Sequence, residues 1–213
     1  MKTEYLKRYL FLAAGLFVMS FGVAFSIKAN LGTSPISSVP YVISLILPIT
    51  VGEATIAMHC VFILIQILIL RKRYQLIQLM QLPVAFVFGF MTDLAVWLLR
   101  GVAYASYPEQ WLLCIVGIVL VATGVSMEVA ANVVTLAGEG LVLAICRVVP
   151  VKFGNMKMCF DGILVATAVL IGICTKGTLL GVREGTVAAA VLVGQLSKQI
   201  CKPMVRLMDK AAN

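Results

Sequence analysis

The stretch Ala29-Asn30-Leu31-Gly32-Thr33-Ser34-Pro35 interrupts a segment, residues 10–47, that is otherwise apolar. A related stretch, Ala131-Asn132-Val133-Val134-Thr135, follows 102 positions later. The same shift superimposes further residues of special backbone character, namely Gly15 on Gly117, Gly22 on Gly124, Pro48 on Pro150 and Gly52 on Gly154. Chance matches in an apolar chain would mostly be Leu, Ile and Val, so the pattern indicates a duplication of roughly residues 9–99 and 111–199.

The composition excludes a soluble globular domain. Of the 213 residues, 62% are hydrophobic and 12% are charged, and the mean hydropathy is +1.05. A soluble protein of this composition would expose large apolar patches. The net charge of +8 does not indicate a nucleic-acid partner, because the basic residues gather at the ends of apolar segments. The chain is therefore expected in a lipid bilayer.

Six apolar segments are long enough to cross a hydrocarbon core of about 30 Å, roughly 7–27, 52–70, 76–99, 111–130, 156–175 and 184–199. Two more, 34–48 and 136–149, are too short to cross comfortably. If both crossed, the basic stretch 71–73 would lie opposite the basic N-terminus, which violates the positive-inside rule. We therefore predict six spans and two re-entrant or half helices, with both chain ends in the cytoplasm. The basic residues left near the outer face are Lys28, Arg100, Lys176 and Arg183.

The duplication then predicts the symmetry. With three spans per half, the second half must enter the membrane from the opposite side, so the repeats are expected to have inverted topology. We expect an all-α polytopic membrane protein with a first repeat (1–99), a linker (100–110), a second repeat (111–199) and a cytoplasmic tail (200–213). Small residues spaced seven apart predict a close-packed seam between the halves, at Gly15, Gly22, Gly117 and Gly124.

The two helix breaks are the first candidates for a binding site. Non-helical backbone at membrane depth persists only where protein or water satisfies its polar groups, and helix starts present free N–H groups. The candidate substrate-binding residues here are Asn30, Thr33, Ser34, Ser37, Asn132 and Thr135. Alternatively, the hydroxyls only cap helices and the amides only join the repeats. Glu139 is a further candidate, and its charge favours a cationic or zwitterionic solute, or a proton or Na⁺ site.

Ionisable side chains within apolar segments are costly and rarely face lipid. His59, the only histidine, and Asp161 occupy equivalent positions in the two halves and are candidates for proton coupling. Asp93 and Glu128 are further candidates. The alternative for His59 and Asp161 is a structural hydrogen-bonded pair, or two groups that never meet. Lys157, in contrast, is expected to be an ordinary cytoplasmic positive charge.

Phe21-Gly22-Val23-Ala24, the stretch 29–35 and Pro48-Ile49-Thr50-Val51-Gly52 resemble the first half of the bacterial membrane proteins grouped as the YczE/YyaS/YitT family. The second half repeats these motifs in degenerate form, so the resemblance covers most of the chain. It implies a multi-pass protein of the bacterial cytoplasmic (inner) membrane. That family has no established substrate, so no site residue is transferred from it.

The sequence carries no Walker A, HExxH or GxSxG motif, so neither an enzyme nor a cofactor is expected. We predict a secondary transporter or facilitator of a small polar solute, with proton coupling as an option. The alternatives are a substrate-capturing subunit of a multi-component importer and a non-transporting membrane scaffold or regulator. The expected partners are the solute and the lipid bilayer, with no nucleic acid, and a homo-oligomer is left open.

Overall fold

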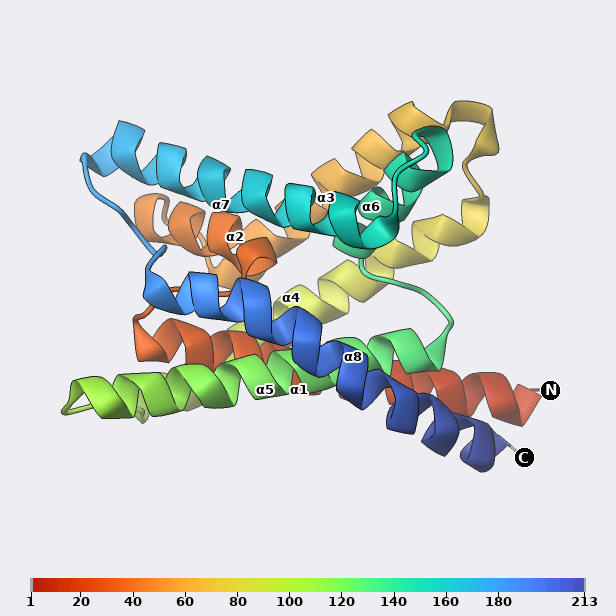
Figure 1. Ribbon diagram of the computed structural model, residues 1–213, viewed down its shortest axis with the longest axis horizontal. Coiled ribbons are helices and arrows are strands. Elements are labelled where there is room, and N and C mark those ends of the chain that lie inside the picture. The colour runs from red at the N-terminus through yellow and green to blue at the C-terminus, as the bar shows by residue number, and fades with distance from the viewer. Residues whose placement is uncertain (1, 213) are drawn as a thin grey trace.

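A computed structural model describes residues 2–212, which form eight α-helices without a strand (Figure 1). The helices are α1 (Lys2–Ala29), α2 (Pro35–Ile46), α3 (Val51–Leu70), α4 (Gln81–Leu98), α5 (Tyr107–Ala131), α6 (Ala137–Val148), α7 (Phe153–Lys176) and α8 (Glu184–Ala212). Short 3-10 helices lie at Arg71–Arg73, Leu76–Met80 and Leu99–Gly101. The predicted all-α class is confirmed.

Five of the helices in the described part, α1, α3, α4, α5 and α7, are long and apolar enough to cross a membrane. Large apolar side chains such as Leu68, Phe90 and Met158 point outward, as expected of a surface that faces lipid. The sixth predicted span, 184–199, forms the first part of α8, which is less apolar because of Gln195 and Lys198. The predicted tail continues α8 as a helix, while residue 213 and the side chain of Lys210 lie outside the described part.

The element bounds recur at the 102-residue shift. Helices α1 and α5 end at equivalent residues, α2 and α6 occupy equivalent ranges, and α3 and α7 begin at equivalent residues. Asn30 and Asn132 follow α1 and α5 with left-handed backbones, at φ values of 54° and 49°. Asparagine tolerates this conformation better than most residues, so both helices break where the sequence predicts.

Helices α1 and α5 pack antiparallel along the predicted glycine seam. A Cβ atom at Gly22 would lie 2.6 Å from the Val121 backbone nitrogen and 2.8 Å from the Gly117 carbonyl oxygen. At the other end of the seam, a Cβ atom at Gly124 would lie 2.6 Å from the Gly15 carbonyl oxygen. Only glycine permits backbones to approach this closely, so this seam fixes how the two halves meet.

Within each break the connecting segment turns back toward the middle of the molecule (Figure 1). Helices α2 and α6 therefore begin in the middle of the molecule and run outward to opposite ends (Figure 1). Their first turns meet, because the Ile36 side chain contacts Gly138. One apolar core surrounds this junction and combines residues of α2, α3, α6 and α7, including Val42, Phe62 and Val142.

The two repeats differ in the packing of their last two helices. In the first repeat α3 lies along α4, and a Cβ atom at Gly89 would come within 2.8 Å of the Gly52 carbonyl oxygen. In the second repeat, within the described residues, α7 and α8 make no comparable contact. Gly154, the counterpart of Gly52, accordingly has open space around it.

Candidate functional site

The first break is a self-contained network of hydroxyl groups. Thr33 and Ser34 are buried, and the Ser34 hydroxyl donates to the Ser37 hydroxyl at 3.2 Å. Ser38 donates to the Pro35 carbonyl oxygen at 2.6 Å. Helix α8 also supports the break, because the Gly185 N–H donates to the Leu31 carbonyl oxygen at 2.8 Å. A backbone group of α8 thus satisfies part of the irregular backbone, which is the kind of support that membrane depth requires.

The two asparagines do not come together. Asn30 is exposed at one end of the α1/α5 pair, where its side chain donates to the Tyr104 hydroxyl at 3.2 Å. Asn132 is exposed at the opposite end and lies beside Tyr5 and Arg8 in a shallow depression. Thr135 is partly exposed nearby. These placements put the amide side chains at the two ends of the molecule, away from the junction of α2 and α6.

The second break carries a buried carboxyl group instead of hydroxyls. Glu128 is 1% exposed, and its Oε1 accepts the Leu136 N–H, at the start of α6, at 2.7 Å. Its Oε2 has no hydrogen-bond partner in the described part of the protein. The equivalent residue of the first repeat is Ser26, which donates to the Gly22 carbonyl oxygen of its own helix. A carboxyl group therefore replaces a neutral hydroxyl at this break.

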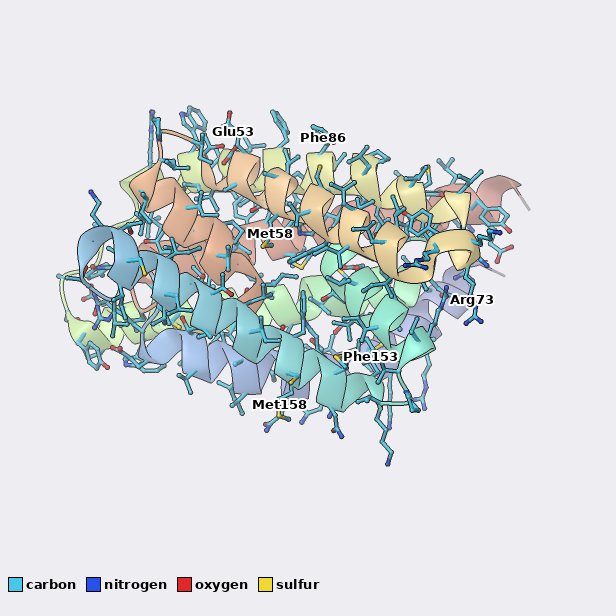
Figure 2. All side chains as sticks on the ribbon, turned by 90° about the horizontal axis from the view of Figure 1, so that it is seen from above. Glu53, Met58, Arg73, Phe86, Phe153 and Met158 are labelled. Atoms are coloured by element: carbon cyan, nitrogen blue, oxygen red, sulfur yellow. The ribbon has the colours of Figure 1, made fainter. Side chains whose placement is uncertain are left out.

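Glu139 of α6 lies beside a pair of charges on α7. The Lys157 ammonium is 3.6 Å from the Glu139 carboxylate and 2.8 Å from the Asp161 carboxylate. The expectation that Lys157 is an ordinary cytoplasmic charge is wrong, since its side chain is only 26% exposed and completes this network. Its neighbour Met158 points to the outside in Figure 2, whereas Lys157 reaches the carboxylates of Glu139 and Asp161.

Two glutamines that the sequence analysis missed also lie at the start of α6. Gln66 of α3 donates to the Gln81 side-chain oxygen at 3.0 Å and to the Ala137 carbonyl oxygen at 3.1 Å. Gly140 makes room for them, because a Cβ atom there would lie 2.9 Å from the Gln66 oxygen. The sequence did hold one sign of this site, because Gln66 is a polar amide within the apolar run 61–70. The two glutamines join α3 and α4 to the start of α6.

His59 lies deep in the protein but does not pair with Asp161. It is 1% exposed, and its ring lies 6.1 Å from the Phe62 ring and 6.2 Å from the Phe88 ring. Its Nδ1 has no partner in the described part of the protein. Asp161 instead pairs with Lys157 at 2.8 Å.

Asp93 lies apart from this cluster and joins α4 to the start of α3. Its carboxylate accepts the Thr50 hydroxyl at 2.6 Å and the Gly52 N–H at 2.7 Å. The equivalent positions of the second repeat hold Lys152, Gly154 and Gln195, and no such bond joins them in the described part of the protein. We call the Asp93 contact with Thr50 and Gly52 the α3/α4 clasp.

We call the set around the start of α6 the α6 cluster: His59, Gln66, Gln81, Glu128, Glu139, Lys157 and Asp161. Four of its atoms are buried without a hydrogen-bond partner in the described chain, namely His59 Nδ1, Gln66 Oε1, Glu128 Oε2 and Glu139 Oε2. Native proteins rarely leave buried polar atoms unpartnered, and ionisable groups at membrane depth usually mark a functional site. Chemically, the cluster can hold protons or bind a polar solute.

Comparisons with known proteins supply a family and no activity. A family described as being of unknown function, DUF6198, matches residues 6–202. Uncharacterized protein YyaS of Bacillus subtilis (strain 168) is 25% identical over 121 residues, which cover 56% of this chain and 59% of the relative. The chain thus spans about three fifths of that relative's length. No solved structure matches. The similarity to YyaS-type proteins expected from the sequence motifs is confirmed.

Proposed function

The chain belongs to the DUF6198 family of unknown function, and from its site we propose that it is a secondary transporter or facilitator of a small polar solute. The observation that carries this proposal is the α6 cluster. Leaving charged and polar groups buried without full compensation costs several kcal/mol by typical estimates. A membrane scaffold would gain nothing from that cost, whereas a transporter needs groups that are free to bind and release.

Inverted-topology repeats are part of this proposal. The antiparallel α1/α5 seam supports them, as do the half helices α2 and α6, which run to opposite ends. Ile36 and Gly138 are equivalent residues and contact one another, as expected if a twofold axis passes between them. In this arrangement α2 and α6 are re-entrant, and the solute site lies at the junction of their first turns and the α6 cluster.

The charge distribution supports a cytoplasmic location for both chain ends. Both ends of the chain lie at the same end of the molecule (Figure 1), and Figure 2 places Arg73 at that end as well. Basic residues are more numerous there than at the opposite end, which holds Lys28, Arg100, Lys176 and Arg183. By the positive-inside rule, the end with the termini faces the cytoplasm, in a bacterial inner membrane.

The unequal packing of the repeats supports an alternating-access mechanism. The α3/α4 clasp holds the outer end of the first repeat together, whereas α7 and α8 lack such packing at the cytoplasmic end. Outside α6 itself, the charged residues of the α6 cluster lie in the cytoplasmic halves of α5 and α7, so this state would admit solute from the cytoplasm. If α7 closed onto α8 while α3 separated from α4, the cytoplasmic end would close and the outer end would open.

A solute screen followed by flux measurement tests the proposal. Purified protein is first screened by thermal shift against pools of small polar metabolites, and each stabilising compound is then tested for uptake into proteoliposomes. We expect at least one hit to be transported. Uptake should fall about tenfold, the effect of losing a contact of 1.4 kcal/mol, in Thr33→Val and Glu139→Gln.

The matched control is Thr167→Val on the exposed face of α7, where the hydroxyl only returns to the Ile163 carbonyl oxygen. This variant should keep wild-type uptake. Hits without flux, together with copurification of an ATPase, would identify a capture subunit of an importer. Proper folding without hits or flux would identify a scaffold or regulator, and a chemically altered lipid would identify an enzyme.

A further inference from the structure

The α6 cluster contains more acid than base. Glu128, Glu139 and Asp161 contribute three carboxyl groups, and Lys157 contributes one ammonium. Asp161 is matched at 2.8 Å, but Glu139 is 3.6 Å from the same ammonium, and no basic group forms an ion pair with Glu128 in the described chain. Because buried carboxylates require compensation, the cluster needs further positive charge.

Two carboxyl oxygens are placed to receive that charge. Glu128 uses Oε1 to accept the Leu136 N–H, and Glu139 uses Oε1 toward Lys157. The Oε2 atoms of both residues are buried and unpartnered in the described chain. Both residues lie at the start of α6, Glu139 in its first turn and Glu128 through its bond to Leu136, the residue that precedes the helix. They are therefore held in place by one oxygen each while the other oxygen stays available.

The surroundings suit an organic ammonium ion better than a metal ion. The Lys157 ammonium already shows how such a group is held, between two carboxylates and 5.7 Å from the centre of the Phe160 ring. The Phe62 ring packs against Phe160 at 5.4 Å. Carboxylates combined with aromatic faces are typical of sites that bind organic cations. Among the described residues, no three metal-ligating side chains are grouped to hold a metal ion.

Building on the transport function proposed above, we propose that the solute is a small organic ammonium ion, which Glu128 and Glu139 bind in exchange for protons. When the ammonium arrives, the carboxylic acid that receives it loses its O–H bond and releases the proton to water. The carboxylate then pairs with the ammonium, and no electron is transferred. Since one pair of oxygens serves both ligands, solute and proton exclude each other and move in opposite directions.

The groups that face these two carboxyls are few. Lys157 of α7 lies 3.6 Å from Glu139 and 2.8 Å from Asp161, and His59 of α3 is the other titratable side chain in their surroundings. On the α1 side, Arg8 donates to the Ala131 carbonyl oxygen at the end of α5.

Proton release from the purified full-length protein tests this inference. The detergent-solubilised protein, in weak buffer with a pH indicator, is mixed with methylammonium, ethylammonium or choline chloride, and with KCl at equal ionic strength. We expect saturable acidification, on the order of one proton per chain, with at least one ammonium salt and not with KCl. No acidification, or equal acidification with KCl, would overturn the inference.

Glu128→Gln and Glu139→Gln should each abolish the release or weaken it at least tenfold. Glu109→Gln is the matched control, because Glu109 is an exposed carboxylate on the same helix as Glu128. Release that persists unchanged in both cluster variants would also overturn the inference. Should Glu128→Gln fail to fold, as judged by gel filtration, Glu139→Gln decides.

The uptake assay separates this inference from the proposed function. Proteoliposomes that take up a neutral or anionic solute, while the protein gives no proton release with ammonium salts, would contradict the ammonium inference and support transport. Ammonium-linked proton release without any flux would support the binding site and contradict the transporter. Proton release with an ammonium salt, together with ammonium uptake that an outwardly directed proton gradient accelerates, would support the ammonium inference and the transport function.

Discussion

The two repeats share a backbone plan but bury different chemistry. At four pairs of equivalent positions the first repeat has three hydroxyls and an imidazole, and the second has charged side chains. The pairs are Ser26 with Glu128, Ser37 with Glu139, Thr55 with Lys157, and His59 with Asp161. All four residues of the first repeat are buried. These positions, related by the 102-residue shift, are thus polar in both halves, while their charge differs.

Where α3 meets α4, and at the equivalent place in the second repeat, the first repeat is the one that carries a negative charge. There the first repeat has the carboxylate, Asp93, and the second has Gln195. Asp93 closes α3 onto α4, whereas the second repeat uses its carboxyl groups around α6 and leaves α7 apart from α8. One copy thus uses charge to hold helices together and the other concentrates charge at the proposed site. Substitutions at matched positions of the two repeats test this contrast.

The α1/α5 seam, where the repeats are alike, should be the least tolerant region. Gly22→Leu would force a side chain against the Val121 backbone nitrogen, 2.6 Å from the position of a Cβ atom. We expect a loss of at least about 3 kcal/mol of unfolding free energy, the upper range for overpacking, or no folded protein. Unfolding in mixed detergent measures it. Gly154→Leu, which enters open space, should change stability little, and equal losses in the two variants would contradict the described packing.

Lys157→Met tests the charged side chains of the second repeat. Removing one partner of a buried ion pair costs about 3–5 kcal/mol, and partial exposure of Lys157 and Asp161 lowers our expectation to about 2 kcal/mol. Thr55→Val, at the equivalent position, removes only a bond to the Val51 carbonyl oxygen and should cost under about 1 kcal/mol. The same unfolding assay compares them. A combined Lys157→Met and Glu139→Gln variant should recover part of the loss.

Sequence reasoning located the breaks and the seam because both depend on glycine and asparagine at fixed spacing. It could not orient Lys157 or Gln66, since a helix that is apolar all round gives no period from which to read its inner face. It also overvalued the equivalence of His59 and Asp161. Equivalence in the two halves does not place two residues in contact: Ile36 and Gly138 do touch, whereas Asp161 pairs with Lys157 and not with His59. Ion pairs between separate helices, such as Glu139 with Lys157, have no signal in a single sequence.

The α3/α4 clasp should contribute modestly to stability and more to conformational state. Asp93→Asn keeps an acceptor but loses the charge that strengthens two hydrogen bonds, so we expect a loss of about 1 kcal/mol. If the clasp closes the outer end, labelling of Thr55→Cys from the outside should increase in the Asp93→Asn background. Gln195→Ala is the control and should leave both stability and labelling unchanged. Unaltered labelling in Asp93→Asn would argue against a gate at this end.

The two left-handed asparagines should show the smallest difference. Glycine adopts a positive φ without strain, so Asn132→Gly should change the unfolding free energy by only a few tenths of a kcal/mol. Asn30→Gly also loses the exposed hydrogen bond to Tyr104 and should cost about 0.5 kcal/mol more. Unfolding of both variants beside Asn30→Ala and Asn132→Ala gives the comparison, because alanine is strained at either position. If alanine were tolerated as well as glycine, the left-handed turn would not be what ends α1 and α5, and the shared origin of the two breaks would lose its physical basis.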